Sequence, residues 1–148
     1  GAFAVEAFDV PHDSADCCGY TITYNDKRFV LITDCGKITE EVSSRALEAD
    51  YLVLESNYDP QMLETGPYPL HLRRRIACST GHLSNTETAE FLRDNSFANL
   101  RQLFLCHLSE NNNTHELVDS AVSQALQDKN VPYHILDRRK VNGFFELD

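Results

Sequence analysis

Short runs rich in apolar and aromatic residues occur in the first third of the chain, separated by polar segments, and this pattern predicts strands. Residues 25–27, Asn-Asp-Lys, form a typical turn signal and predict a hairpin. More continuous apolar runs later in the chain predict buried strands. The predicted strands are residues 3–8, 20–24, 28–33, 51–55, 100–106 and 133–136, with 144–147 as a further candidate.

Helical spacing dominates the second half of the chain. Ser84 followed by Glu87 forms a capping box, which predicts a helix over 84–94. Other helices are predicted over 39–49, where Thr39 caps, over 69–76, and from Thr114 or Asn113 to residue 128. Residues 57–66 are polar and predicted to be irregular. A hairpin followed by alternating strands and helices predicts an α/β fold with a mixed sheet and helices on one face.

The chain has 148 residues, of which 42% are apolar, an ordinary composition for one globular domain. Its formal net charge of −10 argues against a broad, non-specific nucleic-acid surface. It does not exclude a nuclease in which bound cations supply the positive field. The basic run at 73–75, Arg-Arg-Arg, is either a solvated helix face or a contact for a phosphate backbone.

Five cysteines, an odd number without a C-x-x-C pair, favour free thiols and a cytoplasmic location. The first residues carry no basic flank and include an early acid, which is unlike a signal peptide. The chain also begins in strand-like sequence without a leading Met, and we therefore expect it to be a piece of a longer protein.

Histidine or a carboxylate recurs where predicted strands end. His12, Asp34, Glu55 and His107 hold such positions. A single strand-end acid is usually a turn cap, but ligands in open α/β sheets bind at strand ends. Imidazole and carboxylate groups suit a cation such as zinc or manganese. A metal site is therefore one interpretation, and a set of caps is the other.

Residues 81–85, Gly-His-Leu-Ser-Asn, place His82 just before a predicted helix. The free N–H groups of a helix start favour an anion such as phosphate. The alternative is that Ser84 caps the helix and His82 is an ordinary loop residue.

Taken in order, these motifs resemble the second half of a metallo-β-lactamase-fold hydrolase, and its YycJ-like (WalJ) branch in particular. Ribonucleases J and Z are more distant relatives. The motifs are Val10-Pro11-His12-Asp13-Ser14, Thr33-Asp34-Cys35-Gly36-Lys37, Leu54-Glu55-Ser56-Asn57-Tyr58-Asp59, Gly81-His82-Leu83-Ser84-Asn85 and His107-Leu108-Ser109. The resemblance extends over residues 3–131.

The resemblance implies an αββα sandwich, two divalent metal ions (zinc or manganese) in the intact enzyme, and hydrolysis of phosphodiester bonds by a metal-activated water, as in an exonuclease. It implies that His12, Asp34 and His107 bind metal, with Asp34 bridging both ions. It also implies that His82 acts near the scissile phosphate, so that His82 and Asp34 are the expected catalytic residues. The polar residues expected to contact substrate are Glu55, Asn57, Asp59, Ser84 and Asn85.

Two features depart from the family pattern. Tyr58 stands where many relatives carry histidine, and the H-x-H-x-D-H motif of the first half of the fold does not occur in this sequence. We therefore expect residues 1–148 to form one partial domain, with an empty or partly occupied metal site and no hydrolysis by this chain alone. The intact protein would act on nucleic acid or another phosphodiester. The alternative is a non-catalytic half-fold that self-associates through its uncovered sheet face.

Overall fold

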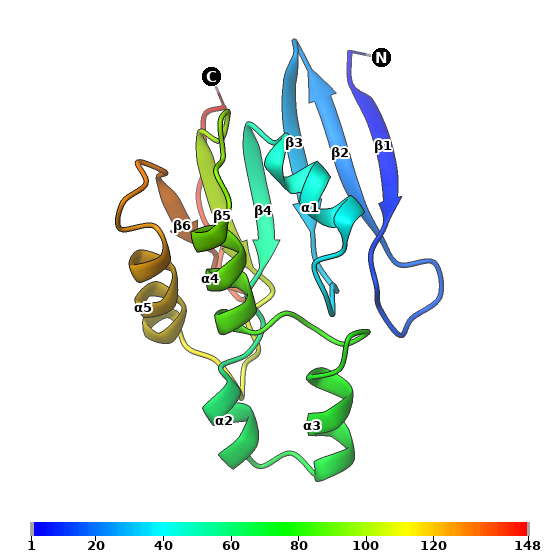
Figure 1. Cartoon of the computed structure of the whole chain (residues 1–148), viewed down its shortest axis with the longest axis vertical. Coiled ribbons are helices and arrows are strands. Elements are labelled where there is room, and N and C mark those ends of the chain that lie inside the picture. The colour runs from blue at the N-terminus through cyan, green and yellow to red at the C-terminus, as the bar shows by residue number, and fades with distance from the viewer. Residues whose placement is uncertain (1, 148) are drawn as a thin grey trace.

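The computed structural model describes residues 2–147, and a six-stranded sheet forms its centre (Figure 1). The strands lie side by side in the order in which they occur along the chain. The first three are antiparallel neighbours, and the last four run parallel. They are β1 (Ala4–Asp9), β2 (Cys18–Tyr24), β3 (Lys27–Ile32), β4 (Tyr51–Glu55), β5 (Gln102–Cys106) and β6 (Tyr133–Ile135). The predicted mixed α/β sheet is confirmed.

Local sequence explains how these strands are connected. Asn25 and Asp26 both have positive φ angles, 46° and 64°, as a tight turn between twisted antiparallel strands requires. Parallel neighbours need crossover connections, and helices supply them. The crossover helices are α1 (Glu40–Leu47), α4 (Asn85–Asp94) and α5 (His115–Ala125). Thr39, Ser84 and Thr114 cap them as the sequence predicts.

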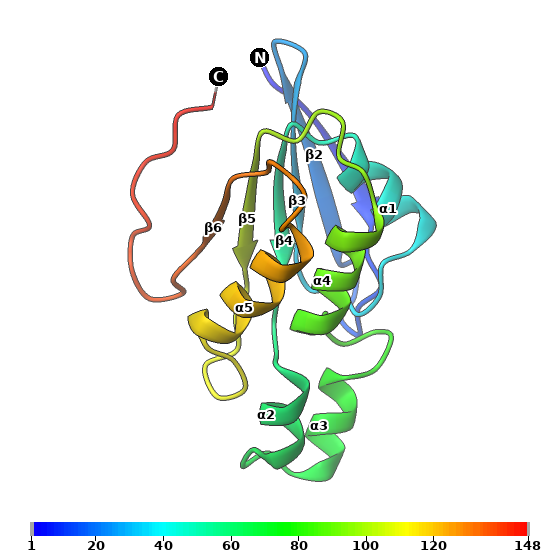
Figure 2. The ribbon, with the colours of Figure 1, turned by 60° about the vertical axis from the view of Figure 1, so that its left-hand side comes forward.

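The core lies between the sheet and these three helices, which cover one face (Figures 1 and 2). Alternate residues of the central strands, such as Leu52 and Leu54, point into it and are fully buried. On the opposite face, Phe145 of the C-terminal segment packs against Phe104, with ring centroids 4.9 Å apart. No helix within residues 2–147 has the length and apolar composition of a membrane span.

Two shorter helices, α2 (Pro60–Thr65) and α3 (Leu70–Ile76), lie beyond the ends of the strands (Figure 1). The prediction of irregular structure over 57–66 is wrong, because the Asp59 side chain caps α2 by accepting from the Met62 N–H. Pro60 suits the first helical position that follows. The Asp-Pro pair carried this signal in the sequence.

Two further expectations need correction. Residues 144–147 do not form a strand, because Phe145 is held by ring packing against Phe104 and His134 instead of ladder pairing. Helix α5 ends at Ala125, three residues before the predicted end, where the Leu126 N–H closes the last turn on Val122.

Candidate metal centre

The direction of four strands gathers the candidate residues at one edge of the sheet. Strand β1 is antiparallel to β2, which is antiparallel to β3, so β1 runs in the same direction as β3, β4 and β5. Their carboxyl ends therefore open at the same edge. His12 follows β1, Asp34 follows β3, Glu55 ends β4 and His107 follows β5. The loop between α3 and α4 adds His82.

The Asp34 carboxylate lies among three imidazoles. Its Oδ1 atom is 3.6 Å from His12 Nε2, 3.8 Å from His107 Nε2 and 3.8 Å from His82 Nδ1. The rings themselves are adjacent, with centroids 5.0 Å apart for His12 and His82 and 5.2 Å apart for His82 and His107. The structure thus brings together every residue that the sequence suggests for metal binding and catalysis.

Glu55 is fully buried beneath this cluster. Its Oε1 atom accepts from Nδ1 of both His82 and His107 at 2.7 Å, and Oε2 accepts from the Cys35 N–H at 2.8 Å. Burial opposes the charge on the carboxylate, yet the bonds from His107, His82 and Cys35 together hold the pKa of Glu55 below its usual range. The same bond to Glu55 outweighs burial and raises the pKa of His107.

His12 and His107 share an orientation that suits metal ligation. Nδ1 of His12 faces the Gly81 carbonyl oxygen at 2.9 Å, and Nδ1 of His107 faces Glu55. In each ring Nε2 then points toward Asp34. Metal-bound histidines typically donate their second ring nitrogen to a carboxylate or carbonyl in this way. His82 differs, because its Nδ1 faces both Glu55 and Asp34.

Unusual backbone geometry presents two of these side chains. Asp34 and His107 have φ angles of 53° and 59°, a left-handed conformation that costs on the order of 1–3 kcal/mol and is concentrated at functional sites. Gly36 and Gly81 pack backbone to backbone, and a Cβ atom on either would clash with main-chain atoms. This close approach brings the Asp34 loop against the His82 loop.

The donor set fits a divalent cation. Two overlapping groups each place their ligand atoms within 4.8 Å of one another: His12, Asp34 and His82, and Glu55, His82 and His107. Imidazole nitrogen with carboxylate oxygen is a combination that zinc and manganese accept. Both groups include His82, and neither is the expected ligand set of His12, Asp34 and His107, which stays a prediction.

The structure gives most of the expected substrate-binding residues other contacts. Asn57 donates to the His107 carbonyl oxygen at 2.7 Å, and Asp59 caps α2. Ser84 forms the capping box of α4, and Asn85 is buried within an amide cluster. Glu55, the fifth of the set, anchors the imidazoles. A direct role of these residues toward substrate stays a prediction.

Sequence reasoning missed an ion pair at the edge of the cluster. Arg75 on α3 pairs with Asp13, the neighbour of His12. These residues help to line a hollow of about 130 Å³ between His12 and His82. The sequence contains both residues, Asp13 in a His-Asp dipeptide and Arg75 in the basic run, but it does not show that they form an ion pair.

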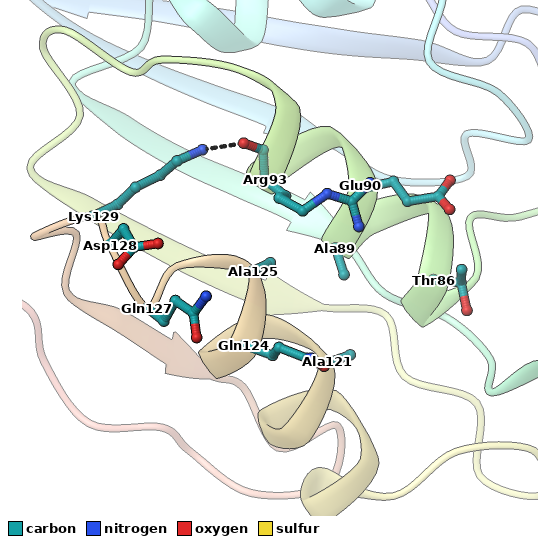
Figure 3. A pocket seen from close by; sticks show the side chains of 10 residues that line it. All are labelled: Thr86, Ala89, Glu90, Arg93, Ala121, Gln124, Ala125, Gln127, Asp128 and Lys129. Carbon is teal, nitrogen blue, oxygen red and sulfur yellow. Dashed lines mark hydrogen bonds between the residues drawn. The ribbon is translucent and has the colours of Figure 1, made fainter.

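A second hollow, of about 380 Å³, lies away from this cluster between α4 and α5 (Figure 3). Lys129 at its end donates to the carbonyl oxygens of Leu92, Arg93 and Asn95, and so satisfies the final turn of α4. Lys129, one of the charged residues that line this hollow, therefore stabilises the end of α4.

Comparisons with known proteins agree with the family resemblance of the sequence motifs. Residues 1–108 match the model of the β-lactamase superfamily domain. The exodeoxyribonuclease YycJ of Bacillus anthracis is 36% identical over 129 residues, which are 87% of this chain and 49% of that protein. The exodeoxyribonuclease WalJ of Streptococcus pneumoniae (strain D39) is 35% identical over 117 residues, 79% of this chain and 44% of that protein. The chain thus spans about half the length of these relatives.

Two solved structures share the fold. The metallo-β-lactamase fold protein YhfI from Bacillus subtilis aligns with a TM-score of 0.66 at 18% identity, over 92% of this chain and 48% of that one. Zinc-bound PqqB from Methylobacterium extorquens aligns with a TM-score of 0.56 at 20% identity, over 90% and 45% of the two chains. These two structures show the fold, and the family match with the two exodeoxyribonuclease relatives confirms the family resemblance carried by the ordered motifs.

Proposed function

Because the chain belongs to the β-lactamase superfamily, in its metallo-β-lactamase-fold branch, we propose that it is part of a metal-dependent nuclease that hydrolyses phosphodiester bonds. The fold implies use of divalent metal, and zinc or manganese is the proposed ion. The exodeoxyribonuclease names of the relatives support a nucleic-acid substrate. The observation that carries the proposal is the shared orientation of His12 and His107, whose Nε2 atoms face Asp34 while their Nδ1 atoms face oxygen acceptors.

In this proposal His12, Asp34 and His107 are the ligands that the chain contributes. A bound divalent ion lowers the pKa of its water and stabilises charge on a phosphoryl oxygen. His82 has a different part, because the ring nitrogen that faces Asp34 is its Nδ1, the same atom that contacts Glu55. A histidine so placed donates a proton to the leaving oxygen. Both catalytic residues expected from the sequence, His82 and Asp34, keep these proposed roles.

The described chain supplies three ligands of a centre that is expected to hold two ions. We therefore propose weak or partial metal binding and no turnover by the chain alone. In the intact protein, the part that corresponds to the unmatched half of the relatives would supply the remaining ligands.

Calorimetric titration with zinc or manganese tests the assignment. Wild-type chain should bind, and His107→Ala should weaken binding by at least about tenfold. His115→Ala, at the exposed start of α5, is the matched control and should leave binding unchanged. Equal affinity in all three proteins would contradict the site, and hydrolysis of a phosphodiester by the isolated chain would contradict its incompleteness.

One observation favours the alternative of a self-associating half-fold. Val5 and Tyr20 lie on the sheet face opposite the helices and are 62% and 39% exposed. Apolar surface of this kind favours association. Sedimentation should then show a dimer that Val5→Lys dissociates, while Leu117→Lys on the exposed side of α5 leaves it intact. A wild-type monomer at high concentration would eliminate this alternative.

A further inference from the structure

A cluster of three buried polar side chains comes from the chain segments that follow Glu55, His82 and His107. Ser56, Asn85 and Asn113 are each almost completely buried. The two asparagines form a reciprocal amide pair: Asn85 Nδ2 donates to Asn113 Oδ1 at 2.8 Å, and Asn113 Nδ2 donates to Asn85 Oδ1 at 2.9 Å. The Ser56 hydroxyl adds a bond of 2.7 Å to Asn85 Oδ1. We name these three residues the amide cluster.

The amide cluster links the three chain segments that carry Glu55, His82 and His107. Ser56 directly follows Glu55, Asn85 lies three residues after His82, and Asn113 lies six residues after His107. Asn113 also donates to the main-chain oxygens of Ser56 at 2.9 Å and Asn57 at 3.0 Å. Loss of one partner would leave several buried polar atoms unsatisfied, which costs about 1–3 kcal/mol for each such group.

We propose that the amide cluster is a positioning device that fixes the separation of His82 and His107 over Glu55, with Asn113 as its central residue. This role rests on the proposed function, in which these two imidazoles serve proton transfer and metal binding. Capping alone does not account for it, because Thr114 caps α5 and Ser84 caps α4. The asparagine side chains bond to one another and to the main-chain oxygens of Ser56 and Asn57, and Asn113 Oδ1 also accepts from the Thr114 N–H.

His12 provides an internal reference for this proposal. Its Nδ1 is tied to the Gly81 carbonyl oxygen, a contact in which the amide cluster takes no part. Disturbing the cluster should therefore separate His82 from His107 while His12 stays beside His82. A general loosening of the fold would affect both ring pairs alike.

Nuclear Overhauser effects between histidine ring protons of the metal-free chain measure both separations. Wild type should show cross-peaks for His82–His107 and for His12–His82. Asn113→Asp keeps the shape but turns the donating amide into an oxygen that faces the Ser56 and Asn57 carbonyls. It should lose the His82–His107 cross-peak and keep the other. Ser56→Ala, which removes a single bond, should weaken the same cross-peak.

Val122→Ala is the control for lost stability, since Val122 is a fully buried α5 residue of the apolar core. It should keep both cross-peaks. A retained His82–His107 cross-peak in folded Asn113→Asp would overturn the proposal, as would loss of both cross-peaks together in either cluster variant. If Asn113→Asp does not fold, an unchanged spectrum of Ser56→Ala overturns it. Zinc titration of wild type is separate: its failure would count against the proposed function and not against the positioning role.

Discussion

Glu55 and His107 are 52 residues apart in sequence, yet Oε1 of Glu55 accepts from Nδ1 of His107 at 2.7 Å. The parallel pairing of β4 with β5 brings them together, because Glu55 ends one strand and His107 follows the other. The buried carboxylate fixes which ring nitrogen remains to face Asp34. Glu55 therefore sets the orientation of His107, a proposed metal ligand.

Glu55→Gln should disturb this arrangement without changing its size. In one orientation the glutamine NH2 group faces the Cys35 N–H, which is itself a donor, and in the other it faces the two imidazoles. The substitution also removes the charge that both rings contact. We expect the free energy of unfolding to fall by about 1–3 kcal/mol. Zinc affinity should fall by about 10–100-fold. Urea unfolding and calorimetry measure the two effects, and unchanged values in both would exclude the anchoring role.

Asp34 offers a way to separate stability from metal binding. Its φ angle of 53° is tolerated by asparagine but disfavoured for alanine. Asp34→Asn should therefore change stability by less than about 0.5 kcal/mol while it weakens metal binding strongly. Asp34→Ala should lose about 1 kcal/mol more in stability than Asp34→Asn. Equal stability of the two variants would show that the backbone conformation carries no such cost.

Asp59 was expected to contact substrate, and the structure makes it the N-cap of α2. Asparagine caps as well as aspartate, so Asp59→Asn should be as stable as wild type, whereas Asp59→Ala should lose about 1 kcal/mol. Thermal unfolding distinguishes the two variants. Should Asp59→Asn alone abolish binding of an oligonucleotide, a substrate contact would be supported instead.

The basic run on α3 borders the cluster through the pair between Arg75 and Asp13. If Arg74 meets a phosphate backbone, Arg74→Glu should weaken DNA binding, and the slope of log affinity against log salt should decrease by about one. Arg93→Glu is the control, because Arg93 pairs with Asp94 at the far end of α4. A salt slope that is the same for wild type and Arg74→Glu would leave the run as a solvated surface.

The thiols should differ in reactivity toward iodoacetamide near neutral pH. Hydrogen bonding to Thr80 lowers the pKa of the exposed Cys78 thiol, and more of it is therefore thiolate at a given pH. Burial raises the pKa of Cys35 and of Cys106 to about 12. Peptide mapping should find Cys78 alkylated before these two, and Thr80→Val should slow its reaction. Labelling of the buried Cys35 or the half-buried Cys106 before Cys78 would contradict this order of reactivity.

The sequence by itself determined most of the elements and the order of the chemical motifs. The Asn-Asp-Lys turn signal predicted the β2–β3 hairpin, the capping box of Ser84 and Glu87 began α4 as predicted, and strand-end residues identified His12, Asp34, Glu55 and His107. These signals are local, since caps, turns and periodicity depend on residues a few positions apart. The Asp-Pro start of α2 was an equally local signal that was not recognised.

Only the tertiary structure decided how the motif residues meet. The strand directions place His12 and His107 around one carboxylate, the packing of Gly36 on Gly81 sets the His82 loop, and the pairing of Asn85 with Asn113 joins two helix starts. Each contact joins residues tens of positions apart, and no periodicity encodes such distances. Burial then set the chemistry: the sequence marks Glu55 as a strand-end carboxylate expected to contact substrate, but enclosure beneath two imidazoles makes it the acceptor that orients them.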